Sequence, residues 1–139
     1  MNVQPFVLDP RLEAETSTVG ELALCRVLLM DDARFPWIVL VPKRAGLVEI
    51  IDLGSADLKR LIEEIATASG VLEAATSPHK LNVAALGNVV RQLHVHIISR
   101  FENDAAWPNP VWGKGERVPY QPVARAEFSG KLRAGFGFG

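Results

Sequence analysis

The most informative stretch of the sequence is Gln92-Leu93-His94-Val95-His96-Ile97-Ile98, in which polar and apolar residues alternate. Successive side chains on an extended strand point to opposite faces, so one face here is apolar and the other carries Gln92, His94 and His96. We expect the apolar face to pack on the core and the two imidazoles to stand side by side on a solvated face. Two of the three histidines in the chain fall in this one alternation, and packing alone does not explain such clustering.

The segments around this stretch predict an α+β domain, with a mostly antiparallel sheet and one long helix packed on it. Runs of branched and apolar residues indicate four strands, at residues 22–30, 37–41, 80–85 and 92–99. The short spacing between the first two favours an antiparallel pair. Asp9-Pro10 is typical of an N-cap followed by the first helical position, and it predicts a short helix through about Thr16. Strands and helices do not alternate strictly, which favours the α+β class.

The long helix is predicted to begin with Ser55 as its N-cap and to end before Pro78. Asp57 then lies in the first turn, where the helix dipole favours an anion. Apolar residues recur at three- and four-residue steps and predict one buried stripe, formed by Leu58, Leu61, Ile62, Ile65, Ala68 and Leu72. The opposite face is predicted to be solvated and consists of Lys59, Arg60, Glu63 and Glu64.

The character of the chain changes from Phe101 onward, where prolines and glycines are frequent enough to break any long element. Four large aromatic residues nevertheless indicate that this part packs on the rest: Trp107, Trp112, Tyr120 and Phe128. We therefore expect residues 1–139 to form a single domain, in which residues 101–139 are a packed extension. The final Gly-Phe-Gly-Phe-Gly is expected to be frayed.

Composition narrows the class of protein. The net charge is -1 and no run of Lys or Arg exceeds two, which argues against a partner such as long nucleic acid but allows a small anionic substrate. Apolar stretches fall far short of the roughly 20 residues of a membrane span. Residues 1–5 lack the pattern of a secretory signal, and Cys25 is the only cysteine, so we expect a cytoplasmic protein without disulfides. Cys25 is interpreted as a buried filler.

Three interpretations of the two histidines compete. The first is that both simply lie on a solvated sheet face. The second is a metal site, for which His79 or Glu102 would have to supply a third ligand. The third is nucleophilic catalysis, in which one imidazole nitrogen attacks while the other is held by a hydrogen bond. The third uses the spacing best, because a second imidazole two residues on can bond a phosphate oxygen.

At these residues the sequence resembles the histidine triad (HIT) family of nucleotide hydrolases and transferases. The family signature alternates three histidines with apolar residues, and it is matched from Leu93 to Ile98 with Gln92 in place of the first histidine. The resemblance runs over about residues 22–100. The stretch from Asp104 to Gly113 looks like that of a bacterial subgroup which also carries Gln for His.

The resemblance implies a HIT-like fold, a homodimer whose sheets join across the interface, and no obligatory cofactor. It also implies that His94 attacks the α-phosphorus of a nucleotide and that His96 donates a hydrogen bond to the phosphate. Substrate-binding roles are implied for four further residues: Asn82, Asn88, Gln92 and Asp31. In the family these positions serve the phosphate or, for Asp31, the ribose hydroxyls.

Three departures from the family pattern bear on the substrate. Gln92 cannot titrate, Val89 lacks the hydroxyl often found there, and Trp37 stands where the phosphoramidase branch often has histidine. These differences favour a dinucleoside polyphosphate-like substrate over a phosphoramidate. They also motivate an alternative, a nucleotide-binding or sensing protein that has lost catalysis.

Overall fold

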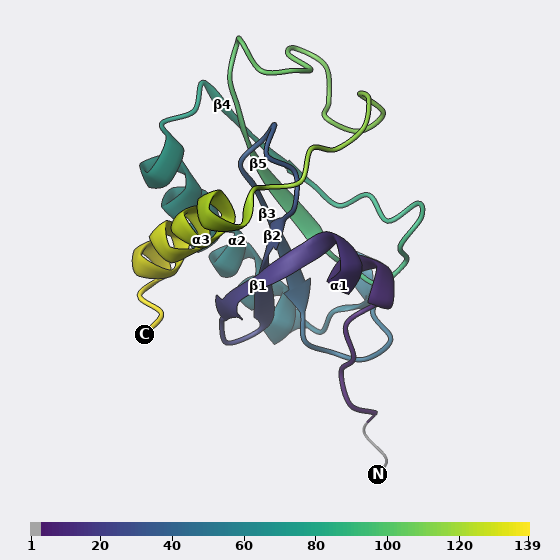
Figure 1. Cartoon of the computed structure of the whole chain (residues 1–139). Coiled ribbons are helices and arrows are strands. Elements are labelled where there is room, and N and C mark those ends of the chain that lie inside the picture. The colour runs from purple at the N-terminus through teal and green to yellow at the C-terminus, as the bar shows by residue number, and fades with distance from the viewer. Residues whose placement is uncertain (1–3) are drawn as a thin grey trace.

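The computed structural model describes residues 4–139, so the first three residues, on which part of the signal prediction falls, lie outside the described residues. It shows five antiparallel strands in the order β1-β2-β3-β5-β4 (Figure 1). The strands are β1 (Thr16–Glu21), β2 (Cys25–Met30), β3 (Trp37–Pro42), β4 (Lys80–Ala84) and β5 (Val95–Arg100). The helices are α1 (Pro10–Glu15), the 3-10 turn η1 (Ile50–Asp52), α2 (Ser55–Thr76) and α3 (Pro122–Phe136). The predicted α+β class and the antiparallel sheet are confirmed.

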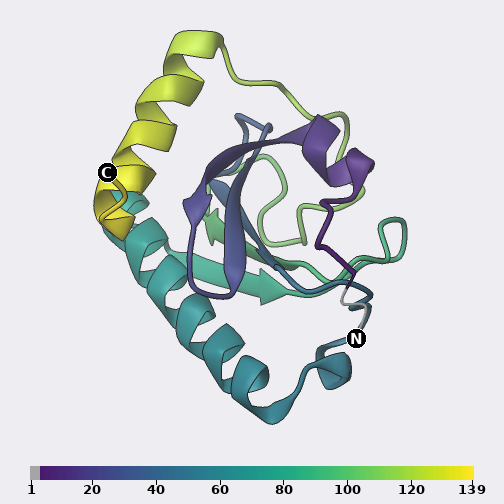
Figure 2. The same cartoon turned by 90° about the horizontal axis from the view of Figure 1, so that it is seen from below.

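The two faces of the sheet pack against different elements. Helices α2 and α3 cover one face, while α1 lies on the other side (Figure 2). The core under the two long helices is built from alternate residues of the central strands: Val27, Leu29, Ile38, Leu40, Val95 and Ile97. The opposite face carries a second apolar cluster, which includes Leu12, Leu28, Trp37, Val39 and Ile98.

The alternation in the histidine-bearing segment is confirmed from Leu93 onward. Leu93 and Val95 join the core under the long helices, and His94 and His96 lie on the other side of the sheet, with Trp37. The strand itself is shorter than predicted, because β5 begins only at Val95. Before that point the chain leaves the ladder, and the amide of Leu93 donates to the carbonyl of Leu47 across 3.0 Å.

The prediction of four strands is wrong, because β1 was not foreseen. Residues 22–24, assigned in the prediction to the next strand, form the turn between β1 and β2, where the Leu22 amide donates to the Cys25 carbonyl across 2.8 Å. β1 is an edge strand in which Val19 is the one fully buried residue. A polar edge strand of this kind lacks the apolar alternation by which strands are recognised.

The long helix α2 differs from its prediction in three details. Gly54 is the N-cap and Ser55 is the first helical residue, although Asp57 does lie in the first turn. Glu64 is buried rather than solvated, because its carboxylate accepts the backbone N–H groups of Leu24 and Cys25 at 2.9 and 2.7 Å. The buried stripe is therefore Leu61, Glu64, Ala68 and Leu72, while Ile62 is 60% exposed.

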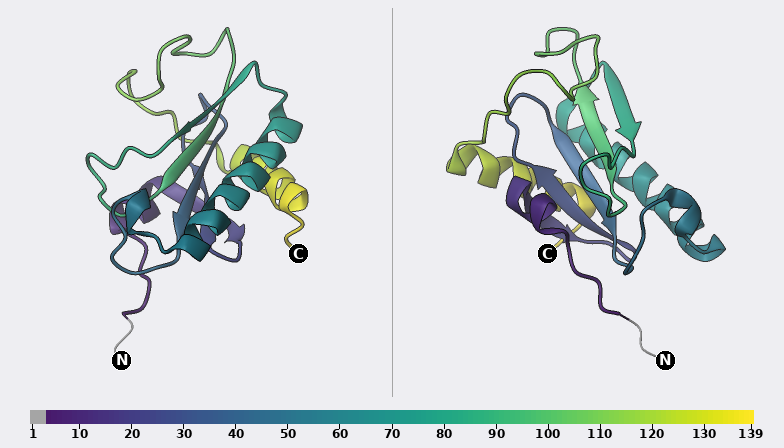
Figure 3. Two further views of the ribbon diagram at one scale, coloured as in Figure 1. Left: turned by 180° about the vertical axis from the view of Figure 1, so that it is seen from behind. Right: turned by 90° about the vertical axis from the view of Figure 1, so that its right-hand side faces the viewer.

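The C-terminal part contains a helix that was not predicted, α3, which begins with Pro122 at its first turn. Its side chain Leu132 is fully buried in the core under α2. The final Phe136 and Phe138 are not frayed: their rings stack at 5.0 Å between centroids and pack against that core. Between β5 and α3, residues 101–121 arch over one end of the sheet (Figure 3).

Two findings bear on the compositional predictions. Cys25 is fully buried, and burial together with the Glu64 carboxylate raises the pKa of its thiol, as suits a structural filler. Within residues 4–139, every helix is too short or too polar to cross a bilayer.

Candidate active site

A cavity of about 380 Å³ opens on the face of the sheet that carries the two histidines. This volume falls in the range of small-molecule sites. Its wall combines α1, the loop between β4 and β5, the sheet and the segment after β5. The lining residues include Leu12, Glu15, Asp32, Arg34, Trp37, Asn88, Val89, His94, His96, Trp112 and Arg117. A single cavity therefore collects both histidines with aromatic and charged groups from distant parts of the chain.

The prediction that the imidazoles stand on a solvated face is wrong. His94 is 6% exposed and His96 is 4% exposed, since the loops and α1 cover this side of the sheet. Both rings nevertheless line the cavity, and their centroids lie 4.8 Å apart. The pair is thus buried from bulk water but accessible to a ligand in the cavity.

The hydrogen bond of His94 defines its tautomer. Nδ1 lies 2.6 Å from the backbone carbonyl oxygen of Gln92, and a carbonyl oxygen can only accept. The neutral ring therefore carries its proton on Nδ1 and keeps a lone pair on Nε2. An imidazole held in this way is suited to nucleophilic attack.

His96 has the opposite arrangement. Its Nδ1 accepts the indole N–H of Trp37 at 3.0 Å, so the neutral ring carries its proton on Nε2. Burial, and secondarily the neighbouring His94, lower the pKa of His96 to about 3. His96 therefore stays neutral at physiological pH and offers a hydrogen-bond donor. Trp112 packs edge-on against the same ring, 5.0 Å between centroids.

The loop between β4 and β5 brings Asn88 to the cavity wall, as its predicted role requires. Gly87 allows the turn: its φ is +85°, and a Cβ there would approach the Val90 carbonyl oxygen to 3.1 Å. Val89 also reaches the wall and is 74% exposed.

The other three predicted substrate-binding residues lie outside this wall and hold protein partners. Asn82 accepts from Nη1 of buried Arg100 at 2.8 Å through its Oδ1. Asp31 accepts the backbone N–H of Tyr120 at 2.9 Å. The Gln92 side chain bonds to the backbone of the N-terminal segment. Substrate contacts by these three side chains remain predictions.

The cavity also contains charged residues that were not predicted from the sequence. Asp32, the neighbour of Asp31, is 2% exposed and holds Arg34 through a 2.8 Å ion pair. Burial raises the pKa of Asp32, but the hydrogen bonds from Arg34 and from the Val118 amide outweigh it and leave the pKa below its usual value. Arg117 lies on the same wall. The remaining N–H groups of these guanidinium groups can donate to an anionic ligand.

The geometry does not support the metal interpretation. His79 and Glu102, the candidate third ligands, face each other instead, with 3.4 Å between Nδ1 and Oε1. Neither lines the cavity. In the described part of the chain no three His, Cys, Asp or Glu side chains are grouped as a metal site requires.

Comparison with known proteins identifies the family. The HIT domain matches residues 11–103, which is more than half of the chain. The chain belongs to the HIT family. A histidine triad protein from Bradyrhizobium japonicum has 44% sequence identity and a TM-score of 0.94, over 96% of this chain and 99% of that chain. One from Marinobacter aquaeolei has 43% identity and a TM-score of 0.94, over 96% and 98%.

A third similar structure is that of a histidine triad (HIT) protein from Sinorhizobium meliloti. It has 42% identity and a TM-score of 0.92, over 94% of this chain and 96% of that chain. Among curated proteins, none shows significant similarity to the chain. Membership of the HIT family suggests a function in nucleotide binding, or in nucleotide hydrolysis or transfer.

Proposed function

We propose that this HIT protein is a nucleotidyl hydrolase or transferase that cleaves its substrate at the α-phosphate through a covalent intermediate on His94. The observation that carries the proposal is the 2.6 Å contact between Nδ1 of His94 and the Gln92 carbonyl oxygen, which leaves the Nε2 lone pair for attack. The buried, neutral His96 beside it supplies a donor for a phosphate oxygen.

The chemistry follows from these two tautomers. The Nε2 lone pair of His94 forms a bond to the α-phosphorus, and the bond from phosphorus to the leaving oxygen breaks. The leaving group departs with that electron pair. The ring, now bonded to phosphorus at Nε2 and to hydrogen at Nδ1, is cationic, and the Gln92 carbonyl stabilises this charge. A water molecule or another acceptor then attacks phosphorus and releases its proton to solvent, while the electrons of the P–N bond return to Nε2.

The proposed substrate is a dinucleoside polyphosphate or a similar anionic nucleotide, bound without an obligatory cofactor. Val89 offers no hydroxyl to protonate an amine leaving group, and the Trp37 indole is engaged with His96. Both features disfavour a phosphoramidate. Arg34, Arg117 and Asn88 on the wall can bind phosphate oxygens. The replacement of the first triad histidine by Gln92 is proposed to define a subgroup of the family.

We also propose that the protein is a cytoplasmic homodimer that acts as one domain. Within residues 4–139, the edge strand β4 has no partner strand on its outer side, and Val83 on it is 49% exposed. Pairing of two such edges would join the sheets. Light scattering coupled to size-exclusion chromatography is expected to give twice the mass of 15.2 kDa, and a monomeric mass would contradict it.

The test of the function is release of nucleoside monophosphate from a panel of dinucleoside polyphosphates, phosphoramidates and nucleoside sulfates. We expect His94→Ala to lower turnover by about 10³-fold or more, since the nucleophile is removed. His79→Ala is the matched control, because His79 is exposed and lies outside the cavity. Equal turnover by the two variants would overturn the proposal.

The second candidate is a nucleotide-binding protein without turnover, which the absence of a titrating group at Gln92 and of a hydroxyl at Val89 favours. Calorimetric titration separates the two. Saturable nucleotide binding with no monophosphate release by the wild-type protein would support this candidate over the enzyme.

A further inference from the structure

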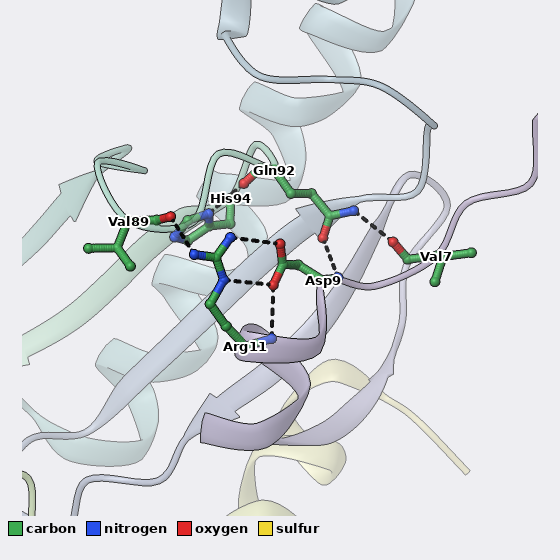
Figure 4. A network of polar contacts seen from close by, with 6 residues as sticks. All are labelled: Val7, Asp9, Arg11, Val89, Gln92 and His94. Atoms are coloured by element: carbon green, nitrogen blue, oxygen red, sulfur yellow. Dashed lines mark hydrogen bonds and ion pairs between the residues drawn. The ribbon is translucent and has the colours of Figure 1, made fainter.

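Gln92 takes the place of a triad histidine, yet its side chain points to the N-terminal segment of the chain (Figure 4). Oε1 accepts the backbone N–H of Asp9 at 2.8 Å. Nε2 donates to the backbone carbonyl of Val7 at 2.8 Å. The side-chain amide of Gln92 therefore accepts one backbone hydrogen bond and donates another. A neutral imidazole has its donor and acceptor nitrogens on different edges of the ring, so a histidine could not make both bonds from one edge.

The same N-terminal segment is tied to the cavity loop at a second point. We call residues 7–12 the N-terminal strap. Arg11 donates from Nη1 to the carbonyl of Val89 at 2.9 Å, and Asp9 holds that guanidinium at 3.4 Å. Asp9 also caps α1 by accepting the Arg11 amide at 2.8 Å. Figure 4 shows these bonds as one connected network between the strap and the loop that precedes His94.

The strap forms part of the cavity. Leu12 at its end and Glu15 at the end of α1 line the same cavity as the loop residues Asn88 and Val89. Leu12 is 2% exposed and packs in the same apolar cluster as Val90, which belongs to the loop before His94, so the strap and this loop meet at the cavity wall. The hydrogen bonds that hold the strap to the loop therefore also hold these cavity-lining residues in place.

We propose that Gln92 is a positioning residue that locks the N-terminal strap across the cavity and so pre-forms the substrate-binding wall. This inference rests on the proposed function of the cavity, but it gives Gln92 a role distinct from proton transfer. The side chain and the backbone of Gln92 have separate tasks. The side chain holds the strap, while the carbonyl orients His94 and survives any substitution at this position.

The first experiment replaces the amide by an apolar side chain of similar length, Gln92→Met. Two neutral hydrogen bonds are lost, so we expect KM to rise about tenfold, with kcat changed less than about threefold because His94 keeps its carbonyl partner. The matched control is Gln121→Met, at an exposed residue before α3 whose side chain makes no capping bond. A fall in kcat at unchanged KM would overturn the proposal.

A structural readout needs no turnover. Hydrogen exchange of the Asp9 amide, measured by NMR, is expected to accelerate about tenfold or more in Gln92→Met and to be unchanged in Gln121→Met. Unchanged protection of Asp9 in Gln92→Met would refute the strap. If the strap is confirmed while the wild-type protein shows no turnover, the proposed function fails and the positioning role stands.

The hydrogen bond between Arg11 and the Val89 carbonyl can be removed independently. Arg11→Met removes the bond to Val89 without touching Gln92, and its side chain is 58% exposed, so folding is expected to survive. We expect a similar rise in KM and, in the double variant with Gln92→Met, less than the product of the two single effects, because both act through one strap. Fully multiplicative effects on KM would contradict a common mechanism.

Discussion

The indole N–H of Trp37 donates to Nδ1 of His96 across 3.0 Å. The two residues lie on neighbouring strands, because Trp37 of β3 stands opposite Ile98 of β5, two residues beyond His96 on the same face. The bond gives His96 the tautomer opposite to that of His94. The pair therefore presents one lone pair and one N–H to the same cavity, which is the combination that attack on a phosphate requires.

Trp37→Phe tests this relationship. The variant removes the donor and leaves His96 free to take the other tautomer, so we expect kcat/KM to fall about tenfold. Nitrogen chemical shifts of the His96 ring, measured by NMR, report the tautomer directly. Trp107→Phe is the control, because Trp107 packs on His79 outside the cavity. An unchanged His96 tautomer in Trp37→Phe would contradict the account.

The lowered pKa of His96 predicts acid sensitivity. The folded pKa is about 3, and an unfolded histidine titrates near 6.5, so only the unfolded state gains this proton between those values. The contribution of neutral His96 to the free energy of unfolding is thus fully present above pH 6.5. It decreases as the pH falls, by about 2 kcal/mol at pH 5. Aspartates whose pKa is lowered in the folded state, such as Asp104, reduce the free energy of unfolding only when the pH falls below about 4.

The measurement is the free energy of unfolding by urea at pH 7 and at pH 5. His96→Gln is expected to lose less stability between the two values than the wild type does. His79→Gln, at the exposed histidine, is expected to keep the wild-type dependence. The account is wrong if His96→Gln shows the same loss as the wild type.

Glu64 is predicted to stabilise the turn into β2. Its carboxylate accepts two buried backbone N–H groups, from Leu24 and Cys25. Glu64→Ala leaves both donors without a partner and is expected to cost about 3 kcal/mol in the free energy of unfolding. Glu63→Ala, the exposed neighbour paired with Arg60, is expected to change it by less than about 0.5 kcal/mol. Equal effects in chemical denaturation would contradict this role.

Two glycines of α3 are predicted to respond to alanine with opposite signs. A Cβ at Gly135 would lie 2.8 Å from Cγ1 of Val71, so Gly135→Ala must push α3 away from α2, and we expect a loss of about 1–2 kcal/mol. A Cβ at Gly130 would meet no atom of another element within 4 Å. Gly130→Ala is therefore expected to raise the free energy of unfolding by up to about 1 kcal/mol. Thermal unfolding of the two variants checks the signs, and a gain at Gly135 would contradict the close packing of the helices.

The sequence was most informative where local periodicity decides the structure. The alternation from Leu93 to Ile97 correctly predicted the two faces of β5, because side-chain direction in a strand depends only on the residue's own position. Local patterns failed where burial was low or partners were distant. Strand β1 buries one residue fully, and α3 begins with a proline and contains two glycines, a composition typical of a loop.

In the candidate site, too, the features that depend on local spacing were predicted and those that depend on distant contacts were not. His94, His96 and Asn88 all line the cavity, and the alternation correctly placed the two imidazoles side by side on one face. The burial of the rings was missed, since it comes from α1 and the segment after β5. The tautomer of His96 depends on Trp37, 59 residues away, and the bonds of Gln92 reach 83 and 85 residues along the chain. No local pattern encodes such contacts.

The most direct test of the central claim is to trap the intermediate. The protein is mixed with a dinucleoside polyphosphate, quenched in base within milliseconds, and digested for tandem mass spectrometry. The account predicts a nucleoside monophosphate joined through a P–N bond to the peptide at His94, present in His79→Ala and absent in His94→Ala. Turnover by the wild type with no adduct at His94, or with the adduct on another residue, would contradict it.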